Sequence, residues 1–140
     1  MKKYSIALLL VLSLAAIGCR KDTSHSQAEQ AATDAALAWL DLIDHGNYAE
    51  SWEQSAAPFK SSMTAEKWAD MVKPVRSPLG KLESRAVANR EYMTSLPGGP
   101  TGEYVVIQFK TTFENKQNAI ETVTPMLENG QWKVSGYYIK

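Results

Sequence analysis

The 140-residue sequence has one cysteine, two histidines and no excess of charge of either sign. A single thiol excludes an intramolecular disulfide, and His25 and His45 do not have the spacing of a metal-binding motif. Lys and Arg number 15, as do Asp and Glu, whereas nucleic-acid-binding domains usually carry a basic excess. These shortages argue against a disulfide framework, a metal or other cofactor, and a nucleic acid as partner.

Catalytic motifs are equally scarce. The Gly-x-Ser-x-Gly elbow is absent, and the glycine-rich segment 96–102 lacks the spacing and the lysine of a phosphate-binding loop. Asp41, Asp44 and His45 lie close together in the sequence, and an acid beside a histidine can act as a general base. The favoured interpretation is that Asp44 and Asn47 organise a turn while Asp41 and His45 are solvated. The sequence therefore predicts no catalytic residue.

The longest apolar run, from about Ile6 to Ile17, is shorter than the roughly 20 residues that cross a bilayer. It follows the basic Lys2 and Lys3 and ends in small residues, which is the pattern of a secretory signal. Residues 1–18 are therefore predicted to be a signal peptide that is removed from the mature protein.

Cys19 is the predicted lipid attachment site. Ala16-Ile17-Gly18-Cys19 resembles the lipobox of bacterial lipoproteins, in which a diacylglycerol is joined to the cysteine sulfur. The resemblance implies an exported protein that faces the periplasm and is held in a membrane by acyl chains such as palmitate. Arg20 stands where lipoproteins retained in the inner membrane of enteric bacteria have Asp, which favours the outer membrane. The alternatives are a plain signal peptide, or a membrane anchor that contains the thiol by chance.

The rest of the chain has the length of one domain. Residues 19–27 are predicted to be the lipidated N-terminus and a tether, and residues 28–140 a single domain. Ser26 and Glu29 have the spacing of a capping box, which predicts a first, long helix from Ser26 to a C-cap at Gly46. Its apolar stripe comprises Ala32, Ala35, Ala36, Trp39, Leu40 and Ile43.

Two further helices are expected before the composition changes at Gly80. The first follows Asn47 and ends around Pro58, and the second starts at Thr64 and ends before Pro78. The apolar face predicted for the latter comprises Trp68, Met71, Val72 and Val75.

After Gly80 the apolar period becomes two, which predicts strands over 82–89, 104–113, 119–127 and 131–139. The polar segment 114–118 is expected to form a turn, and Asn129-Gly130 is a strong hairpin signal. Pro125 indicates an edge strand or a bulge, and Gly136 a kink.

Helices followed by an antiparallel meander predict the α+β class. We expect three N-terminal helices, one of them long, packed on a curved four-stranded antiparallel sheet. This order resembles the cystatin-like or NTF2-like cone, and a flat two-layer α/β sandwich is the alternative.

Residues along nearly the whole mature chain resemble the bacterial secreted proteins grouped as domain of unknown function 4019. The resemblance implies a fold and an exported location, but no activity, substrate or catalytic residue. The segments that carry it are 38–40, Asp44, Gly46, Tyr48, 51–52, 59–60, Trp68, 76–80, 96–97, 103–106, 121–123, 130–133 and 136–140.

Arg76 and Arg85 flank the entry to the sheet, where an arginine fork could hold the carboxylate of a ligand. The favoured interpretation is structural, with Arg76 bonded to carbonyls or paired with Glu103 or Glu121. Similarly, a place in the core is favoured over a ligand pocket for the tryptophans, which are Trp39, Trp52, Trp68 and Trp132.

Three functions remain open. The favoured one is a non-enzymatic lipoprotein that binds an envelope protein or a small apolar ligand. The second is an NTF2-like enzyme that acts on a small apolar substrate in the cone, which requires Asp41, Tyr104 or Tyr138 to point into an open cavity. The third is a structural module that forms a homodimer through the open face of the sheet. The candidate pocket residues are Trp39, Arg76, Tyr104 and Tyr138.

Overall fold

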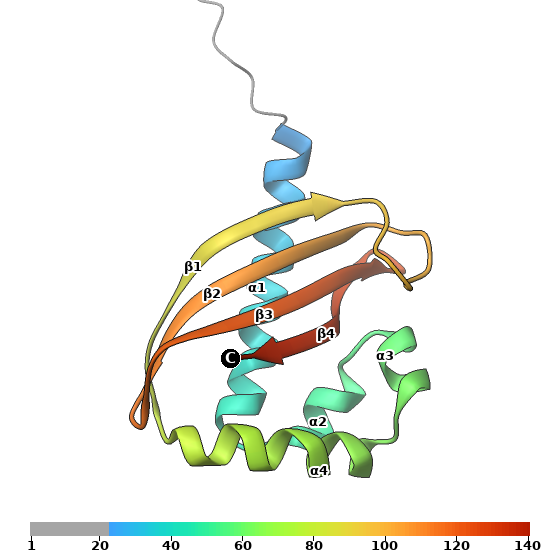
Figure 1. Ribbon diagram of the computed structural model, residues 1–140. Coiled ribbons are helices and arrows are strands. Elements are labelled where there is room, and N and C mark those ends of the chain that lie inside the picture. The colour runs from blue at the N-terminus through green and yellow to red at the C-terminus, as the bar shows by residue number, and fades with distance from the viewer. Residues whose placement is uncertain (1–22) are drawn as a thin grey trace, which may run out of the picture.

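The computed structural model describes residues 23–140, in which helices come first and a sheet follows (Figure 1). The α+β class predicted from the sequence is confirmed. The helices are α1 (Thr23–Asp44), α2 (Tyr48–Glu53), α3 (Ala57–Ser62), α4 (Ala65–Arg76) and the 3-10 helix η1 (Ser77–Leu79), and the strands are β1 (Leu82–Met93), β2 (Tyr104–Phe113), β3 (Lys116–Glu128) and β4 (Gln131–Ile139). The predicted signal peptide, Cys19 and Arg20 lie outside the described residues.

The four strands form one antiparallel sheet in the order β1-β2-β3-β4, with β1 and β4 at its edges. Figure 1 shows that the sheet bends around α1, which starts beyond β1 and ends on the side of β4 and α4. α1 contacts all four strands. The curved sheet around a long helix agrees with the prediction.

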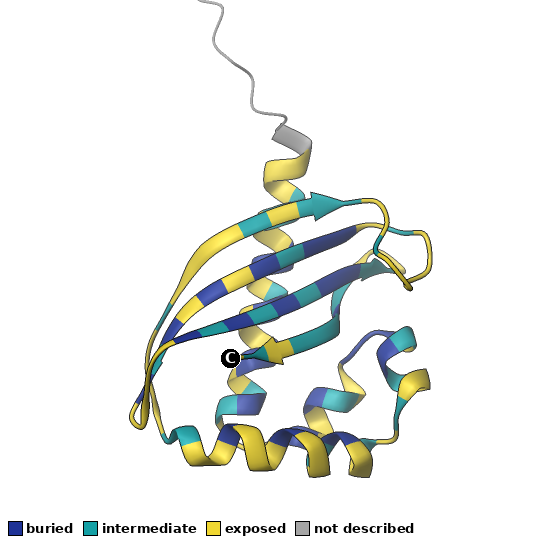
Figure 2. Ribbon diagram, viewed as in Figure 1, coloured by how far each residue is buried: buried dark blue, intermediate teal, exposed yellow. Residues whose placement is uncertain are grey.

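The core lies between α1 and the concave face of the sheet (Figure 2). Ala32 and Ala36 are fully buried and small enough for α1 to approach the strands closely, and the larger Trp39, Leu40 and Ile43 are buried further along the helix. These residues confirm most of the predicted apolar stripe. The sheet contributes alternate residues, as a half-buried strand must, and these are mainly Val105, Ile107, Phe109, Val123 and Val134.

The start of α1 differs from the prediction. The helix begins at Thr23, so Ser26 and Glu29 lie inside it and the predicted capping box is wrong. The first turn has a tertiary contact that the sequence did not reveal, because the rings of His25 and Tyr92 on β1 stack with their centres 4.3 Å apart. The segment predicted as a tether is therefore helical from Thr23 onward.

Pro58 begins a helix instead of ending one. It lies in the first turn of α3, where the missing N–H of proline removes no helical hydrogen bond. The described chain therefore has four α-helices, where three were predicted.

The buried face of α4 also differs from the prediction. Thr64 caps the helix as expected, with its Oγ1 accepting a hydrogen bond from the backbone N–H of Lys67. However, Met71 and Val75 are 51% and 49% exposed. The buried residues instead follow a spacing of four and are Trp68, Val72 and Arg76.

Two details of the sheet correct the sequence prediction. β3 lies between β2 and β4, so the edge position proposed for Pro125 is wrong and the bulge is confirmed. Thr124 pairs with Gly136 and Pro125 with Val134, which leaves Ser135 as the extra residue of β4. β3 starts at Lys116 because the preceding turn contains only two residues.

The hairpin between β3 and β4 is confirmed. Asn129 and Gly130 have φ values of 51° and 78°, both in the left-handed region that a tight two-residue hairpin requires.

Gly80, between η1 and β1, provides a test of the packing at the entry to the sheet. Its φ is +75°, and a Cβ atom at this position would lie 2.7 Å from the Glu114 Oε2 atom and 2.9 Å from the Glu114 Cβ atom. Gly98 has a φ of +77° but open space around it. We expect Gly98→Ala to lower the free energy of unfolding by about 1 kcal/mol, from backbone strain alone. Gly80→Ala should cost at least about 1 kcal/mol more, because overpacking against Glu114 is added to the backbone strain.

Urea denaturation followed by tryptophan fluorescence measures both variants. Equal losses would show that the contact with Glu114 does not constrain this corner.

Candidate functional site

Four charged side chains meet inside the molecule, and we call Asp44, Arg76, Arg85 and Glu121 the four-charge cluster. They come from the end of α1, the end of α4, the first half of β1 and the middle of β3. Each side chain is less than one tenth exposed. Two positive and two negative charges balance, as buried charges must because an unpaired one is costly to desolvate.

Glu121 lies on the concave face of β3 and is fully buried. Its Oε2 atom accepts hydrogen bonds from Arg85 Nε and Thr111 Oγ1, both at 2.6 Å. Its Oε1 atom accepts from Arg85 Nη2 at 3.2 Å and from the Tyr137 hydroxyl at 2.8 Å. Both oxygens thus receive two hydrogen bonds, which uses the full acceptor capacity of the carboxylate.

Asp44 is shared between the two arginines. Its Oδ2 atom accepts from Arg85 Nη1 at 2.7 Å, and its Oδ1 atom accepts from Arg85 Nη2 and Arg76 Nη2, both at 3.1 Å. Arg76 also donates from Nη1 to the carbonyl of Gly80 at 2.7 Å, and its guanidinium lies 4.4 Å from the centre of the Phe113 ring. Within the described part of the chain, every buried side-chain nitrogen and oxygen has a hydrogen-bond partner.

These contacts favour the structural interpretation of the arginines and correct its details. Arg85 pairs with Glu121, but Arg76 pairs with Asp44 and not with either predicted acid. Glu103 instead accepts a hydrogen bond from the Tyr92 hydroxyl at 2.6 Å.

Asp44 was the member that sequence reasoning missed, because it was assigned to the turn after the first helix. A signal was present. Asp44 continues the spacing of four set by the buried Ala36 and Leu40, and Glu121 occupies the same strand face as the buried Ala119 and Val123. A charge at an apolar position of a periodic pattern indicates a buried, paired group.

Three other residues near the end of α1 were considered in the sequence, namely Asp41, His45 and Asn47. Asp41 and His45 are exposed, with 3.5 Å between Asp41 Oδ1 and His45 Nδ1, as the solvated interpretation expects. Asn47 is the N-cap residue of α2, as its position before that helix predicted, but its side chain makes no capping hydrogen bond.

Aromatic rings fill the interior beside the four-charge cluster. The ring centres of Trp39 and Tyr137 lie 5.4 Å apart, and those of Phe59 and Trp68 lie 5.0 Å apart. Trp39 donates its indole N–H to the carbonyl of Ser51, and Trp68 donates to the Ser51 hydroxyl. Trp39 and Trp68 are thus core residues, and Trp52 and Trp132 are half-buried against the same core.

The structure does not bring the candidate pocket residues together. Trp39, Arg76 and Tyr104 are buried, and the Tyr104 hydroxyl is bonded to the carbonyl of Pro100. Tyr138 is 62% exposed and Asp41 is also exposed. The open cavity with a convergent acid or tyrosine, which the enzyme hypothesis requires, is not formed by these residues.

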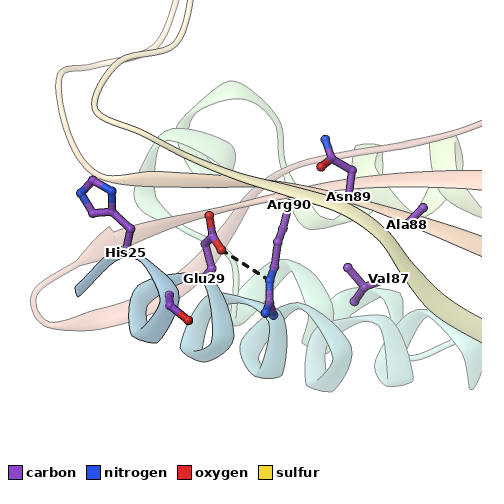
Figure 3. Close-up of a pocket in the computed structure, with 7 residues that line it drawn as sticks. His25, Glu29, Val87, Ala88, Asn89 and Arg90 are labelled. Atoms are coloured by element: carbon purple, nitrogen blue, oxygen red, sulfur yellow. Dashed lines mark ion pairs between the residues drawn. The ribbon is translucent and has the colours of Figure 1, made fainter. Parts of the chain in front are cut away.

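Depressions that open to solvent lie around this filled interior. One of them, of about 530 Å³, lies between the first turns of α1 and the edge strand β1 (Figure 3). Its charged groups already pair with one another, since Arg90 Nε lies 3.5 Å from Glu29 Oε2 and Arg90 Nη1 donates to Gln30 at 3.1 Å. Others, of about 340, 330 and 220 Å³, lie beside the turn after α1, between α3 and the loop 96–100, and between α4 and β4.

Two further findings concern the described residues 23–140 as a whole. No three His, Cys, Asp or Glu side chains gather there in the manner of metal ligands. None of the helices in this range has the length and apolar character needed to cross a membrane.

Glu121→Gln tests the balance of charge in the cluster. The change keeps the shape of the side chain but leaves Arg85 with less than its full compensation, so we expect the free energy of unfolding to fall by about 3 kcal/mol. Asp41→Asn is the matched control, because it removes an exposed charge from the same part of the molecule and should cost less than about 0.5 kcal/mol. Guanidinium denaturation measures both. If Glu121→Gln lowers the free energy of unfolding as little as the control does, balanced charge in the cluster is not needed for stability.

Tyr137 should make the free energy of unfolding decrease at alkaline pH. Burial, together with the neighbouring Glu121 carboxylate, raises the pKa of Tyr137 above its ordinary value. Above a pH of about 10 the unfolded chain therefore releases this proton while the folded chain retains it, and stability falls as the pH rises. Tyr137→Phe should lower stability at neutral pH by about 1 kcal/mol and flatten the decline above pH 10.

Unfolding free energies measured from pH 7 to pH 11 check this expectation. Tyr138→Phe is the control, since it removes an exposed hydroxyl. An unchanged slope in Tyr137→Phe would show that Tyr137 is not the group responsible.

A family model described as a protein of unknown function, DUF4019, matches residues 35–137. The match runs from within α1 into β4 and includes all four members of the four-charge cluster. A search of curated proteins finds no significant match. The chain therefore belongs to the DUF4019 family of proteins of unknown function.

Proposed function

We propose that this protein is a lipid-anchored bacterial envelope protein whose domain binds a partner and performs no catalysis. The observation that favours this role over an enzyme acting in the cone is the filled interior, where aromatic rings pack together and the charges are paired. Glu121, the most buried acid, has no acceptor capacity left for a substrate proton. Partners must therefore be bound at the outer surface.

The proposed anchor is the thioether of Cys19. Each buried methylene of an acyl chain contributes about 0.8 kcal/mol, so two or more chains hold a protein stably at a membrane. Only three residues separate Cys19 from the first residue of α1. Four residue steps reach at most about 14 Å, which holds the start of α1 close to the lipid headgroups.

The compartment and the membrane are part of the same proposal. The leader supports export to the periplasm, and Arg20 after the cysteine favours the outer membrane. A homodimer through the outer face of the sheet is the less favoured arrangement, since this face presents exposed polar side chains such as Gln108 and Lys110.

Cys19→Ser tests the anchor. The variant has no sulfur for the diacylglycerol, so we expect it to move from the membrane fraction to the soluble fraction and to lose incorporation of labelled palmitate. Its thermal unfolding midpoint should not change, because Cys19 precedes the folded domain. Thr23→Ser, a mild change four residues away, is the matched control and should remain in the membrane fraction. A Cys19→Ser protein that still sediments with membranes would refute the lipoprotein proposal.

A further inference from the structure

The groove between α4 and β4 exposes apolar side chains that the core does not use. Met71 and Val75, one helical turn apart on α4, form its outer wall, while Trp68 and Val72 form its floor. The opposite wall is the last part of β4, Tyr137–Ile139. The groove has a volume of about 220 Å³, which is room for a few side chains and not for a large cofactor.

The backbone of β4 has a free edge in this groove. Lys140 and Ile120 exchange two hydrogen bonds, from Lys140 N to Ile120 O at 3.1 Å and from Ile120 N to Lys140 O at 2.9 Å. Hydrogen-bonded pairs alternate along an antiparallel ladder, so the N–H and C=O groups of Tyr137 and Ile139 face away from β3. An exposed edge of this kind is a template for another strand.

The first half of β4 is protected, in contrast to the second. The backbone N–H of Ala56 donates to the carbonyl of Val134 at 2.8 Å, and α3 contacts β4. Only the half that borders the apolar groove is therefore open to pairing. An occupant must satisfy both features, which an extended polypeptide does by pairing its backbone with β4 and placing alternate apolar side chains against α4.

The bilayer is a poor candidate for the occupant, and this step rests on the proposed anchor. α1 has 22 residues and is about 33 Å long. It starts beyond β1 and ends on the side of β4 and α4 (Figure 1). With the start of α1 held near the headgroups, the groove lies on the side of the domain that faces away from the membrane.

The same geometry rules out antiparallel pairing of β4 with a second copy anchored in the same membrane. Antiparallel pairing of two β4 edges relates the copies by a two-fold axis and turns one copy upside down relative to the other. The starts of the two α1 helices then point in opposite directions. Two short tethers cannot enter one bilayer from such a dimer.

We infer that the α4–β4 groove binds an extended segment of a different polypeptide, which adds as a strand to Tyr137–Ile139 and places apolar side chains against Met71 and Val75.

The experiment uses the purified mature protein in detergent and a phage-displayed library of random twelve-residue peptides as the probe. We expect enriched peptides to have apolar residues at alternate positions. A synthetic peptide of the enriched sequence, measured by fluorescence anisotropy, should bind Met71→Lys and Val75→Lys at least about tenfold more weakly than the unchanged protein. Val87→Lys is the matched control, because Val87 is 43% exposed on β1 at the opposite edge, and it should leave the affinity unchanged.

Hydrogen exchange gives a readout of strand addition itself. The amide protons of Tyr137 and Ile139 should exchange more slowly when the peptide is bound, because they become donors to the added strand. Failure to enrich a peptide, equal weakening by Val87→Lys, or unchanged exchange at both amides would overturn the inference. The inference would also be overturned if the anchored protein self-associates on vesicles and Val75→Lys abolishes this self-association, since the occupant of the groove would then be a second copy.

Peptide binding and membrane anchoring are read out separately. If no peptide binds in the groove but the protein still attaches to membranes, only this inference is refuted. If the Cys19→Ser protein stays membrane-bound, only the proposed lipid anchor is refuted.

Discussion

The rest of the structure depends on the Arg85 guanidinium, which binds two buried carboxylates at once. From β1 it reaches Glu121 on β3 and Asp44 at the end of α1, and Arg76 extends the chain of ion pairs to α4. A buried ion pair adds little net stability, but an unpaired member is costly. The cluster therefore selects one arrangement of four elements. A one-residue slip of β3 would move Glu121 to the outer face and leave Arg85 without half of its compensation.

The same contacts occupy the lone pairs of the buried Glu121 carboxylate. A catalytic acid or base needs a free lone pair or a proton that can be exchanged with a substrate, whereas both oxygens of Glu121 already accept two hydrogen bonds each. Tyr137 connects this closed centre with the surface. Its hydroxyl is bound to Glu121 and its ring contacts Trp39, while its backbone lies on the free edge of β4. A strand added at this edge would thus pair with a residue whose side chain is bound to the four-charge cluster.

Apolar periodicity was sufficient to predict the α+β class, the four strands and the long first helix, because burial of one face imposes the period directly. Its failures have specific causes. α3 was missed because Pro58 can either end a helix or occupy its first turn, and the choice depends on the surroundings. The start of α1 was misplaced because the stacking of His25 on Tyr92 joins residues far apart in the sequence. The site was harder still, since Asp44, Arg76 and Glu121 lie on apolar faces and only their mutual distances show that they are partners.

Under the proposed anchoring, the two edges of the sheet lie at opposite ends of α1 and therefore at different distances from the membrane. At one end, the proposed anchor and its short tether bring the β1 edge near the lipid, where Arg90 and Glu29 already satisfy each other. At the other end, the second half of the β4 edge is unprotected and borders apolar side chains, and it lies about one helix length, roughly 33 Å, further out. Anchoring in a plane raises the local concentration of the groove for any partner that lies in or near the same plane. Such a partner must extend a strand-forming segment past the headgroup region. The height of the groove above the membrane therefore limits binding to polypeptides that extend this far.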